Sequence, residues 1–182
     1  SAGDDTLTVT DDTSVMVDGG DGADTLIGNA GDDTLLGGSG SDTLIGGGGA
    51  DVVDGGQDDD LLELDGSAGV TAEGGDGRDT VVLVGETNEA SLSGVEVVVG
   101  SAGDDSVTVS TNDIEAISGG EGFDDVTLTD ASGNTVDLAG VEVITGSAGD
   151  DTLTVTDDTS VMVDGGDGAD TLIGNAGDDT LL

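Results

Sequence analysis

A nine-residue phrase recurs along most of this 182-residue chain, and this regularity limits the folds that the chain can adopt. Residues 19–45 read GGDGADTLIGNAGDDTLLGGSGSDTLI, which is the same phrase three times in succession. Each copy has Gly at places one and four, Asp at place six and an aliphatic residue at place eight. Short repeats of this kind are typical of solenoids, in which each unit packs mainly against its neighbours.

Clear copies of the phrase begin at Gly19, Gly28, Gly37, Gly46, Gly55, Gly74, Gly100, Gly119, Gly146, Gly165 and Gly174. The gaps between them hold degenerate copies. SLSGVEVVV (91–99) and DLAGVEVIT (137–145) align with Gly94 and Gly140 at place four, and with Glu96 and Glu142 at place six. Residues 9–18 and 64–73 keep only the length of the phrase, within one residue.

A coarser repeat overlies the fine one, because residues 1–36 recur without change as residues 147–182. Residues 1–146 therefore form one full tandem period of 16 nine-residue units, and residues 147–182 begin the next period. We expect residues 1–182 to form a single continuous solenoid, and both ends of the chain to be interior points of a longer tandem array.

Place eight predicts the core. In the clear units it is always Leu, Val or Ile, and it sits in a short β-favouring segment such as Thr-Leu-Ile. These segments alternate with Gly-rich turns, and no helical period of 3.6 residues occurs. The pattern predicts parallel strands stacked in a coil, with each unit forming half a turn and a core one column wide.

The charge is extreme: 42 Asp and Glu face one basic residue, Arg78, for a net charge of -41. An acidic disordered tail is one interpretation of such a composition, but 34% of the residues are hydrophobic and recur with a fixed period. His and Cys are absent, which excludes disulfides, thiol chemistry and His-based catalysis. Nucleic acid is repelled, and the apolar runs are too short for membrane insertion. The charge attracts cations.

The phrase GGxGxDx(aliphatic)x resembles the nonapeptide of the RTX family, as GGDGADTLI, GNAGDDTLL, GGSGSDTLI and GGDGRDTVV illustrate. The resemblance implies an all-β, right-handed parallel β-roll with two nonapeptides per turn. It also implies several calcium ions between the Gly-rich turns of successive coils, held by the place-six Asp carboxylates and by backbone carbonyls.

Calcium takes six to eight hard oxygen ligands, and Gly-rich turns can direct several carbonyls at one point. Units two apart in sequence share an edge of the roll, so the predicted ligands pair along the edges. On one edge the pairs are Asp5 with Asp24, Asp24 with Asp42, Asp42 with Asp60, and Asp60 with Asp79, and the second copy repeats the first of them as Asp151 with Asp170. On the other edge they are Asp33 with Asp51 and Asp105 with Asp124. Asp179 is a further candidate, and Asp79 with Glu96 and Asp124 with Glu142 are weaker pairs because Glu is longer than Asp.

Other sites fit less well. No window has the ligand order of an EF-hand, and an Asp at place six would repel a phosphate in a GxGxxG loop. A carboxylate pair could serve glycoside hydrolysis, but a repeating ladder offers no unique cleft, and we expect no enzyme. The Asp residues at place five (Asp4, Asp32, Asp104, Asp150 and Asp178) and those in TDDT (11–12 and 157–158) are interpreted as solvated surface, and so is Arg78.

We therefore expect a calcium-dependent structural rod or spacer from a repetitive secreted or cell-surface protein, such as an adhesin or extracellular fibre. Its partners would be calcium ions and neighbouring identical repeats in the same chain or fibre. The resemblance implies type I export and folding outside the cell, hence an extracellular or bacterial cell-surface location. The alternative is a folding and secretion appendage of an exported enzyme or toxin. A flat binding face for ice or glycan would need a more regular outward Thr or aromatic array.

Overall fold

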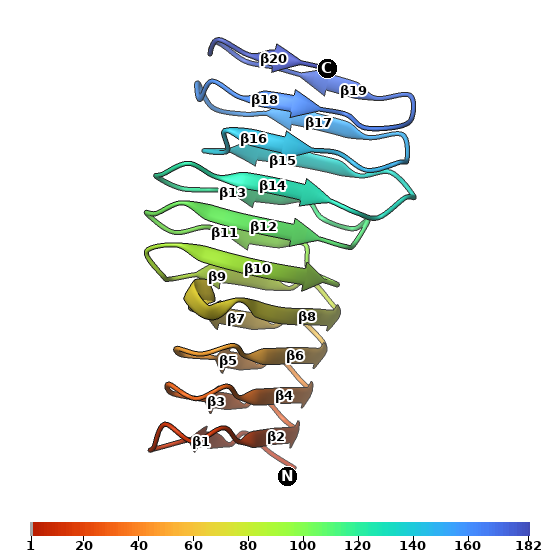
Figure 1. Ribbon diagram of the computed structural model, residues 1–182. Coiled ribbons are helices and arrows are strands. Elements are labelled where there is room, and N and C mark those ends of the chain that lie inside the picture. Colours follow the sequence, from red (N-terminus) through yellow and green to blue (C-terminus); the bar gives the residue numbers. More distant parts are fainter. Residues whose placement is uncertain (1) are drawn as a thin grey trace.

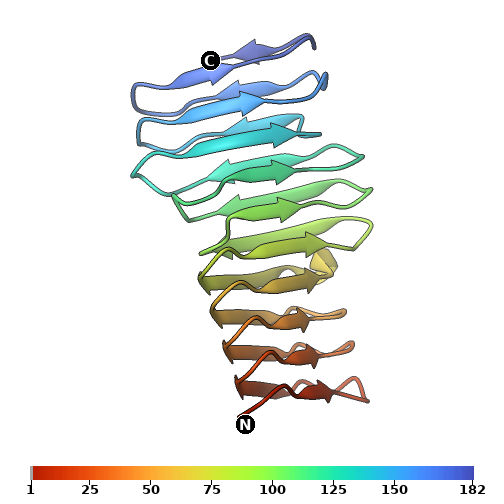
Figure 2. The ribbon, with the colours of Figure 1, turned by 180° about the vertical axis from the view of Figure 1, so that it is seen from behind.

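Two long parallel sheets face each other along the whole molecule (Figures 1 and 2). The computed structural model describes residues 2–182, and within them twenty short strands alternate between the two sheets, ten in each. Each strand pairs in parallel with the strand two further along the chain, so one coil consists of two strands and two turns. The two chain ends therefore lie at opposite ends of the stack (Figure 1). The expected all-β parallel β-roll is confirmed.

The odd sheet contains β1 (Thr6–Thr8), β3 (Thr25–Ile27), β5 (Thr43–Ile45), β7 (Leu61–Leu64), β9 (Thr80–Leu83), β11 (Val97–Val99), β13 (Ala116–Ser118), β15 (Thr135–Ala139), β17 (Thr152–Val155) and β19 (Thr171–Ile173). The even sheet contains β2 (Met16–Asp21), β4 (Thr34–Ser39), β6 (Val52–Gln57), β8 (Val70–Asp76), β10 (Asn88–Ser93), β12 (Asp105–Val109), β14 (Asp125–Leu128), β16 (Val143–Thr145), β18 (Met162–Asp164) and β20 (Thr180–Leu181). One 3-10 turn, η1 (Gly66–Ala68), lies between β7 and β8.

The place-eight residues point inward, as their period predicts. In a Thr-Leu-Ile strand only the middle side chain faces the other sheet, since side chains alternate along a strand. Leu26 lies beside Leu44 and Leu44 beside Leu62 on neighbouring strands, and all three are fully buried. The exceptions lie in the end coils. Leu172 and Leu181, in the last coil, are partly buried and 42% exposed respectively, and Leu7, in the first coil, is 37% exposed.

The core is wider than the single column predicted. From residue 19 to residue 60, the inward position that follows each place-eight side chain is the place-one Gly of the next unit. Further along, this position often holds a second buried aliphatic residue, in the pairs Leu62 with Leu64, Val81 with Leu83, Val107 with Val109, Val126 with Leu128, and Leu153 with Val155. None of the five turns that follow these pairs has the sequence GGxGxD. The chain thus places either a Gly or a hydrocarbon side chain at the entrance of each turn.

The place-eight column also shifts sideways within the even sheet. Val53 lies beside Ala72, but Val107 lies beside Ala90, which lies beside Val70. Strand β8 carries both Val70 and Ala72 and so joins the two columns. In Figure 1 the coils above β8 are accordingly offset from those below it.

Two turns are shorter than the nonapeptide alignment predicts. Gly94 was aligned with place four, but its carbonyl accepts a hydrogen bond from the N–H of Gly75, at place two of the neighbouring turn. Gly140 likewise lies beside Gly119, a place-one residue. The turn therefore passes from Gly94 through buried Val95 to Glu96 and omits three residues relative to 74–79.

Strands β1 and β17 lie in the same sheet, with sixteen strands from β1 to β16 within residues 2–146. The second copy of the 36-residue sequence therefore begins on the same side of the roll as the first. Its register is compatible with continuation of the coil from one period to the next.

Candidate metal centres

The place-six carboxylates form a ladder along each edge of the roll. On the first edge, made by the turns that precede the odd strands, Oδ1 of Asp24 accepts the N–H of Asp5 at 2.7 Å, and Oδ1 of Asp42 accepts that of Asp24 at 2.7 Å. The same bond joins Asp60 to Asp42 at 2.7 Å and Asp79 to Asp60 at 2.8 Å. Each carboxylate thus fixes the position of the turn before it.

The remaining predicted pairs also lie on consecutive coils. Asp170 accepts the N–H of Asp151 at 3.0 Å on the first edge. On the second edge, made by the turns that precede the even strands, Asp51 accepts from Asp33 at 2.9 Å and Asp124 from Asp105 at 2.8 Å. Asp179, in the last coil, accepts instead from the backbone of Val161 at 3.3 Å.

Glutamate occupies place six where the turn is short. Oε2 of Glu96 accepts the N–H of Asp79 at 2.6 Å, and Oε2 of Glu142 accepts that of Asp124 at 2.8 Å. The extra methylene of Glu lets the carboxylate reach the neighbouring coil from a turn that lacks three residues. The ladder therefore continues through both short turns.

In the part of the chain that the structure describes, the second carboxylate oxygen is buried and without a hydrogen-bond partner at seven of these positions. Oδ2 has no hydrogen-bond partner within residues 2–182 at Asp24, Asp33, Asp42, Asp51, Asp60, Asp79 and Asp124. These side chains are no more than 4% exposed. A buried carboxylate oxygen without a donor is costly, because it has lost its hydration without replacement.

Each unused oxygen borders a small cradle that only Gly leaves open. A Cβ added at Gly37 would lie 2.4 Å from Oδ2 of Asp42 and 2.4 Å from the carbonyl oxygen of Gly55. The same arrangement occurs at Gly55, with Oδ2 of Asp60 at 2.4 Å and the carbonyl of Gly74 at 2.6 Å. Carboxylate and carbonyl oxygens from two successive coils therefore converge beside the place-one Gly, which suits a hard cation.

The electrostatics of the ladder also favour a cation. Burial raises the pKa of Asp60 to about 7 and that of Asp124 to about 6, and neighbouring carboxylates add to the effect. Burial likewise raises the pKa of Asp42, Asp51, Asp79 and Glu96. Burial therefore opposes ionisation of these groups, and a bound cation would compensate their charge.

Carboxylates alone do not make a metal site here. No group of three or more acidic side chains within residues 2–182 has the geometry to hold a metal ion. A calcium site would therefore combine one or two place-six carboxylates with several backbone carbonyls. This is an accepted composition for calcium, whose ligands include carbonyl oxygens.

The place-five Asp residues form a second, outer ladder that the sequence interpretation missed. They are exposed, as expected, but Oδ1 of Asp4, Asp32, Asp104 and Asp150 accepts the N–H at place five of the next coil on the same edge, from Ala23, Ala50, Phe123 and Ala169 respectively. Asp157 also has a backbone partner, since its Oδ2 accepts the N–H of Gly140 at 2.7 Å. These carboxylates link successive turns from the outside.

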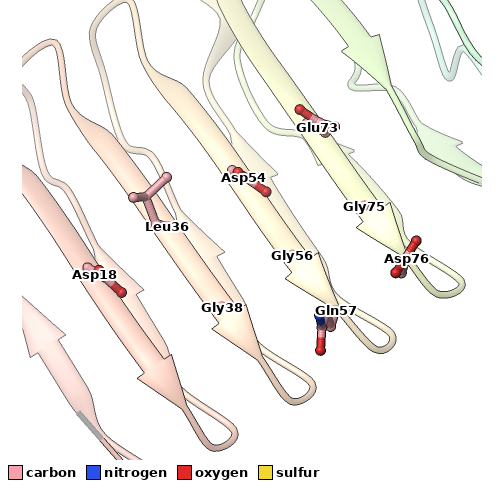
Figure 3. A pocket seen from close by; sticks show the side chains of 9 residues that line it. All are labelled: Asp18, Leu36, Gly38, Asp54, Gly56, Gln57, Glu73, Gly75 and Asp76. Atoms are coloured by element: carbon pink, nitrogen blue, oxygen red, sulfur yellow. The ribbon is translucent and has the colours of Figure 1, made fainter.

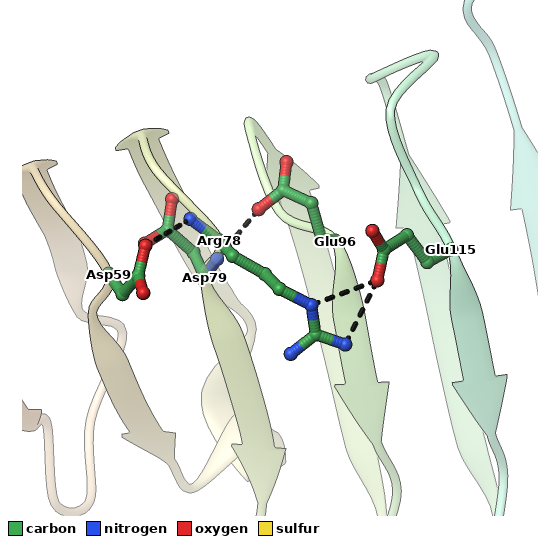
Figure 4. Close-up of polar contacts among 5 residues, drawn as sticks. All are labelled: Asp59, Arg78, Asp79, Glu96 and Glu115. Carbon is green, nitrogen blue, oxygen red and sulfur yellow. Dashed lines mark hydrogen bonds and ion pairs between the residues drawn. The ribbon is translucent and has the colours of Figure 1, made fainter.

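Arg78 is held above the first edge (Figure 4). Its backbone N–H donates to Asp59, and its guanidinium reaches past Glu96 to Glu115, with a 2.9 Å ion pair. Both side chains of the pair are more than half exposed, so the contribution of this ion pair to stability is at most about 1 kcal/mol.

A shallow acidic hollow of about 570 Å³ lies on the outer face of β2, β4, β6 and β8 (Figure 3). Asp18, Leu36, Asp54 and Glu73 lie side by side across it, next to a row of glycines that includes Gly38 and Gly56. None of its carboxylates is buried. The carboxylates of the hollow therefore differ in burial from the place-six carboxylates, and we interpret them as hydrated surface charge.

Four residues that contact the ladder were not predicted from the sequence: Asn88, Ser101, Asn134 and Ser147. Asn88 contacts Ser101 and Asp105, and Asn134 contacts Ser147 and Asp151 in the same way. A sequence signal for them exists, because both Asn residues precede a GVE turn and then a GSAGDD turn at the same spacing.

The fold and the ladder define a class: a calcium-binding parallel β-roll whose turns are lined with carboxylate and carbonyl oxygens. Comparison with protein families agrees. The RTX calcium-binding nonapeptide repeat (4 copies) matches residues 16–44, 27–62, 36–70, 138–158 and 162–182, together more than half of the chain. The chain belongs to this family, and it is a structural repeat region that binds several calcium ions. No curated protein matches the chain.

Within residues 2–182, no helix is long and apolar enough to cross a bilayer.

Proposed function

We propose that this chain is a segment of a calcium-dependent structural rod, a spacer in a repetitive secreted or cell-surface protein that folds when it meets calcium outside the cell. The observation that carries the proposal is the row of buried, unpartnered Oδ2 atoms beside Gly cradles. Weak sites of the extracellular kind, with dissociation constants of about 0.1 to 1 mM, would fill at the calcium level outside cells.

The metal-free roll is disfavoured at neutral pH. The pKa of Asp60 is raised to about 7 and that of Asp124 to about 6. A carboxyl whose pKa is raised by folding stabilises the fold while it is protonated, and this stability is lost as the pH rises through the folded-state value. Near neutral pH the ladder therefore needs a cation in place of its protons, which makes folding conditional on calcium.

The exact 146-residue repeat supports a rod over a secretion appendage. Sixteen strands per period make eight coils, and at a parallel-strand spacing of roughly 4.8 Å each further period adds roughly 38 Å. A spacer gains reach with every identical copy, whereas an appendage gains little. Small-angle scattering of two-period and three-period chains in calcium should show this step in length, and a profile of flexible beads would contradict the rod.

Asp42 tests the ligand assignment. Its Oδ1 accepts from Asp24, its own N–H donates to Asp60, and its Oδ2 is unpartnered. We expect Asp42→Asn to lose about two bound ions and to need more calcium to fold, because each ion requires a deprotonated carboxylate. The control is Asp130→Asn, at a partly exposed residue that caps its own turn by accepting the N–H of Ser132. Equal calcium titrations of the two variants, followed by circular dichroism, would exclude place six as the metal ligand.

A further inference from the structure

Two stretches of the roll share a pattern that the nonapeptide does not describe. Residues 88–105 and 134–151 both contain an Asn, then GVE, then GSAGDD, at an offset of 46 residues. Five strands separate them, so Asn88 lies on the second edge and Asn134 on the first. The same local sequence is therefore used once on each edge.

In both stretches the Asn amide faces a place-six carboxylate of the next coil. Nδ2 of Asn88 donates to Oδ1 of Asp105 at 2.6 Å and to Oγ of Ser101 at 3.1 Å. The backbone N–H of Ser101 donates to Oδ2 of Asp105 at 2.7 Å. Both oxygens of Asp105 are thus satisfied by protein donors.

The second stretch repeats these contacts. Nδ2 of Asn134 donates to Oδ1 of Asp151 at 2.8 Å, and the N–H of Ser147 donates to Oδ2 of Asp151 at 2.8 Å. Asn134 and Asp151 are each 1% exposed. The backbone N–H of Asn134 adds a bond of 2.6 Å to the same carboxylate.

The orientation of the Asn88 amide is fixed from both sides. Its Oδ1 accepts the N–H of Gly66 at 2.8 Å, so Nδ2 must face Asp105. Oδ1 of Asn134 has no such donor among the described residues. Both ends of the Asn88 amide therefore have hydrogen-bond partners, and Asn88 is the better residue for a test.

The turn that leads to each Asn also differs from a calcium-type turn. Leu83 and Leu128 occupy the place-one position before Asn88 and Asn134, and both are 2% exposed. A hydrocarbon side chain thus fills the entrance that Gly leaves open elsewhere. The turns of Asp105 and Asp151 themselves keep a place-one Gly, Gly100 and Gly146, as the turn of Asp42 keeps Gly37. What distinguishes Asp42 is that its Oδ2 is left without a donor among the described residues.

We propose that the Asn88–Asp105 and Asn134–Asp151 junctions are cation-free clasps. In each clasp the side-chain amide of Asn and the backbone N–H of Ser bind the carboxylate oxygens, which calcium binds at the other turns. The carboxylates of Asp105 and Asp151 then take no calcium, because their oxygens already have donors. The inference rests on the proposed function and limits it: calcium bridges one set of turns, and hydrogen bonds alone hold these two junctions.

The test counts calcium ions bound per folded chain, by equilibrium dialysis at saturating calcium. Asp42 and Asp105 are a matched pair, since both are buried and both accept a hydrogen bond from the preceding coil. Asp42 accepts the backbone N–H of Asp24, and Asp105 accepts the side-chain amide of Asn88. We expect Asp42→Asn to lose about two ions and Asp105→Asn to lose none. Loss of ions from Asp105→Asn equal to that from Asp42→Asn would overturn the clasp.

Variants at Asn88 decide the question even if Asp105→Asn fails to fold. Asn88→Ala should keep the wild-type number of ions but need more calcium to fold. Asn88→Asp should bind about one ion more, because it sets two carboxylates against each other. Asn112→Asp, at an exposed Asn, is the charge-matched control. Fewer ions in Asn88→Ala would show that Asn88 is itself a ligand and would overturn the clasp. A wild-type chain that bound no calcium would instead refute the proposed function.

Discussion

Residues 1–36 and 147–182 have the same sequence but opposite patterns of burial. In the first copy Leu7 is 37% exposed and Leu35 is fully buried; in the second, the equivalent Leu153 is fully buried and Leu181 is 42% exposed. The first copy begins in the end coil and continues into the interior, and the second begins in the interior and continues into the other end coil. In a β-roll, burial is thus decided by which coils lie on either side and not by the residue itself.

Secondary structure follows the same rule. The sequence MVDGGD forms a six-residue strand at Met16–Asp21 but only a three-residue strand at Met162–Asp164. In the first copy the glycines pair with those of the adjacent calcium-type turn, as Gly20 does with Gly38. In the second copy the neighbour β20 is only two residues long. The six-residue strand therefore forms where the neighbouring strand is long enough to pair with it.

Calcium removal should give the largest effect and should reveal the difference between ends and interior. As calcium is lowered, we expect amide hydrogen exchange to rise first in the two end coils (residues 2–18 and 165–182) and later in the interior, because an end coil has a neighbour on one side only. In excess chelator near neutral pH the β signal should disappear. Simultaneous loss of protection in all coils would mean that the roll folds as one cooperative unit.

The matched substitutions Leu153→Ala and Leu7→Ala should differ by several kcal/mol. Leu153 is fully buried, and removing a buried Leu side chain costs about 2–5 kcal/mol in the free energy of unfolding. Leu7 stands at the same place in the same sequence but is 37% exposed, so its loss should cost about 1 kcal/mol or less. Chemical denaturation in saturating calcium measures both, and equal costs would contradict the role assigned to neighbouring coils.

Extending the chain should remove that difference. Adding residues 129–146 in front of Ser1 would give the first copy the neighbour that the second copy has. The cost of Leu7→Ala should then rise by about 1–3 kcal/mol towards that of Leu153→Ala. A prefix of the same length made of Gly and Ser is the control and should leave the cost of Leu7→Ala unchanged.

A smaller effect is expected at the TDDT turn. Asp157 accepts the N–H of Gly140 at 2.7 Å, whereas among residues 2–182 Asp11, its equivalent in the first copy, bonds only within its own turn, to Thr13. Asp157→Ala should cost about 1 kcal/mol, since it leaves that N–H without an acceptor. Asp11→Ala should leave the denaturation midpoint nearly unchanged. A comparable cost at both sites would show that the Asx turn, and not the bond to Gly140, is what stabilises the roll.

The sequence by itself determined the elements of this protein. Place eight predicted the inward side chains, as at Leu26 and Leu44, because strict period and β-favouring flanks leave a strand few alternatives. The spacing of two units predicted which carboxylates neighbour each other, such as Asp24 and Asp42. The sequence pattern suffices for these features, because in a coil of two units per turn the residue about 18 positions further along the chain lies on the neighbouring strand or turn.

Only the tertiary structure decided what each carboxylate faces. Asp42 and Asp105 have the same place in the phrase, yet one leaves an oxygen without a donor and the other meets Asn88 and Ser101. The alignment also put Gly94 at place four, but in the structure its carbonyl lies beside Gly74 and Gly75, at places one and two of the neighbouring turn, because its own turn lacks three residues. Such differences depend on the length and side chains of the coils on either side. A carboxylate oxygen is satisfied by groups brought to it across the stack, and their positions follow from packing that the phrase alone does not encode.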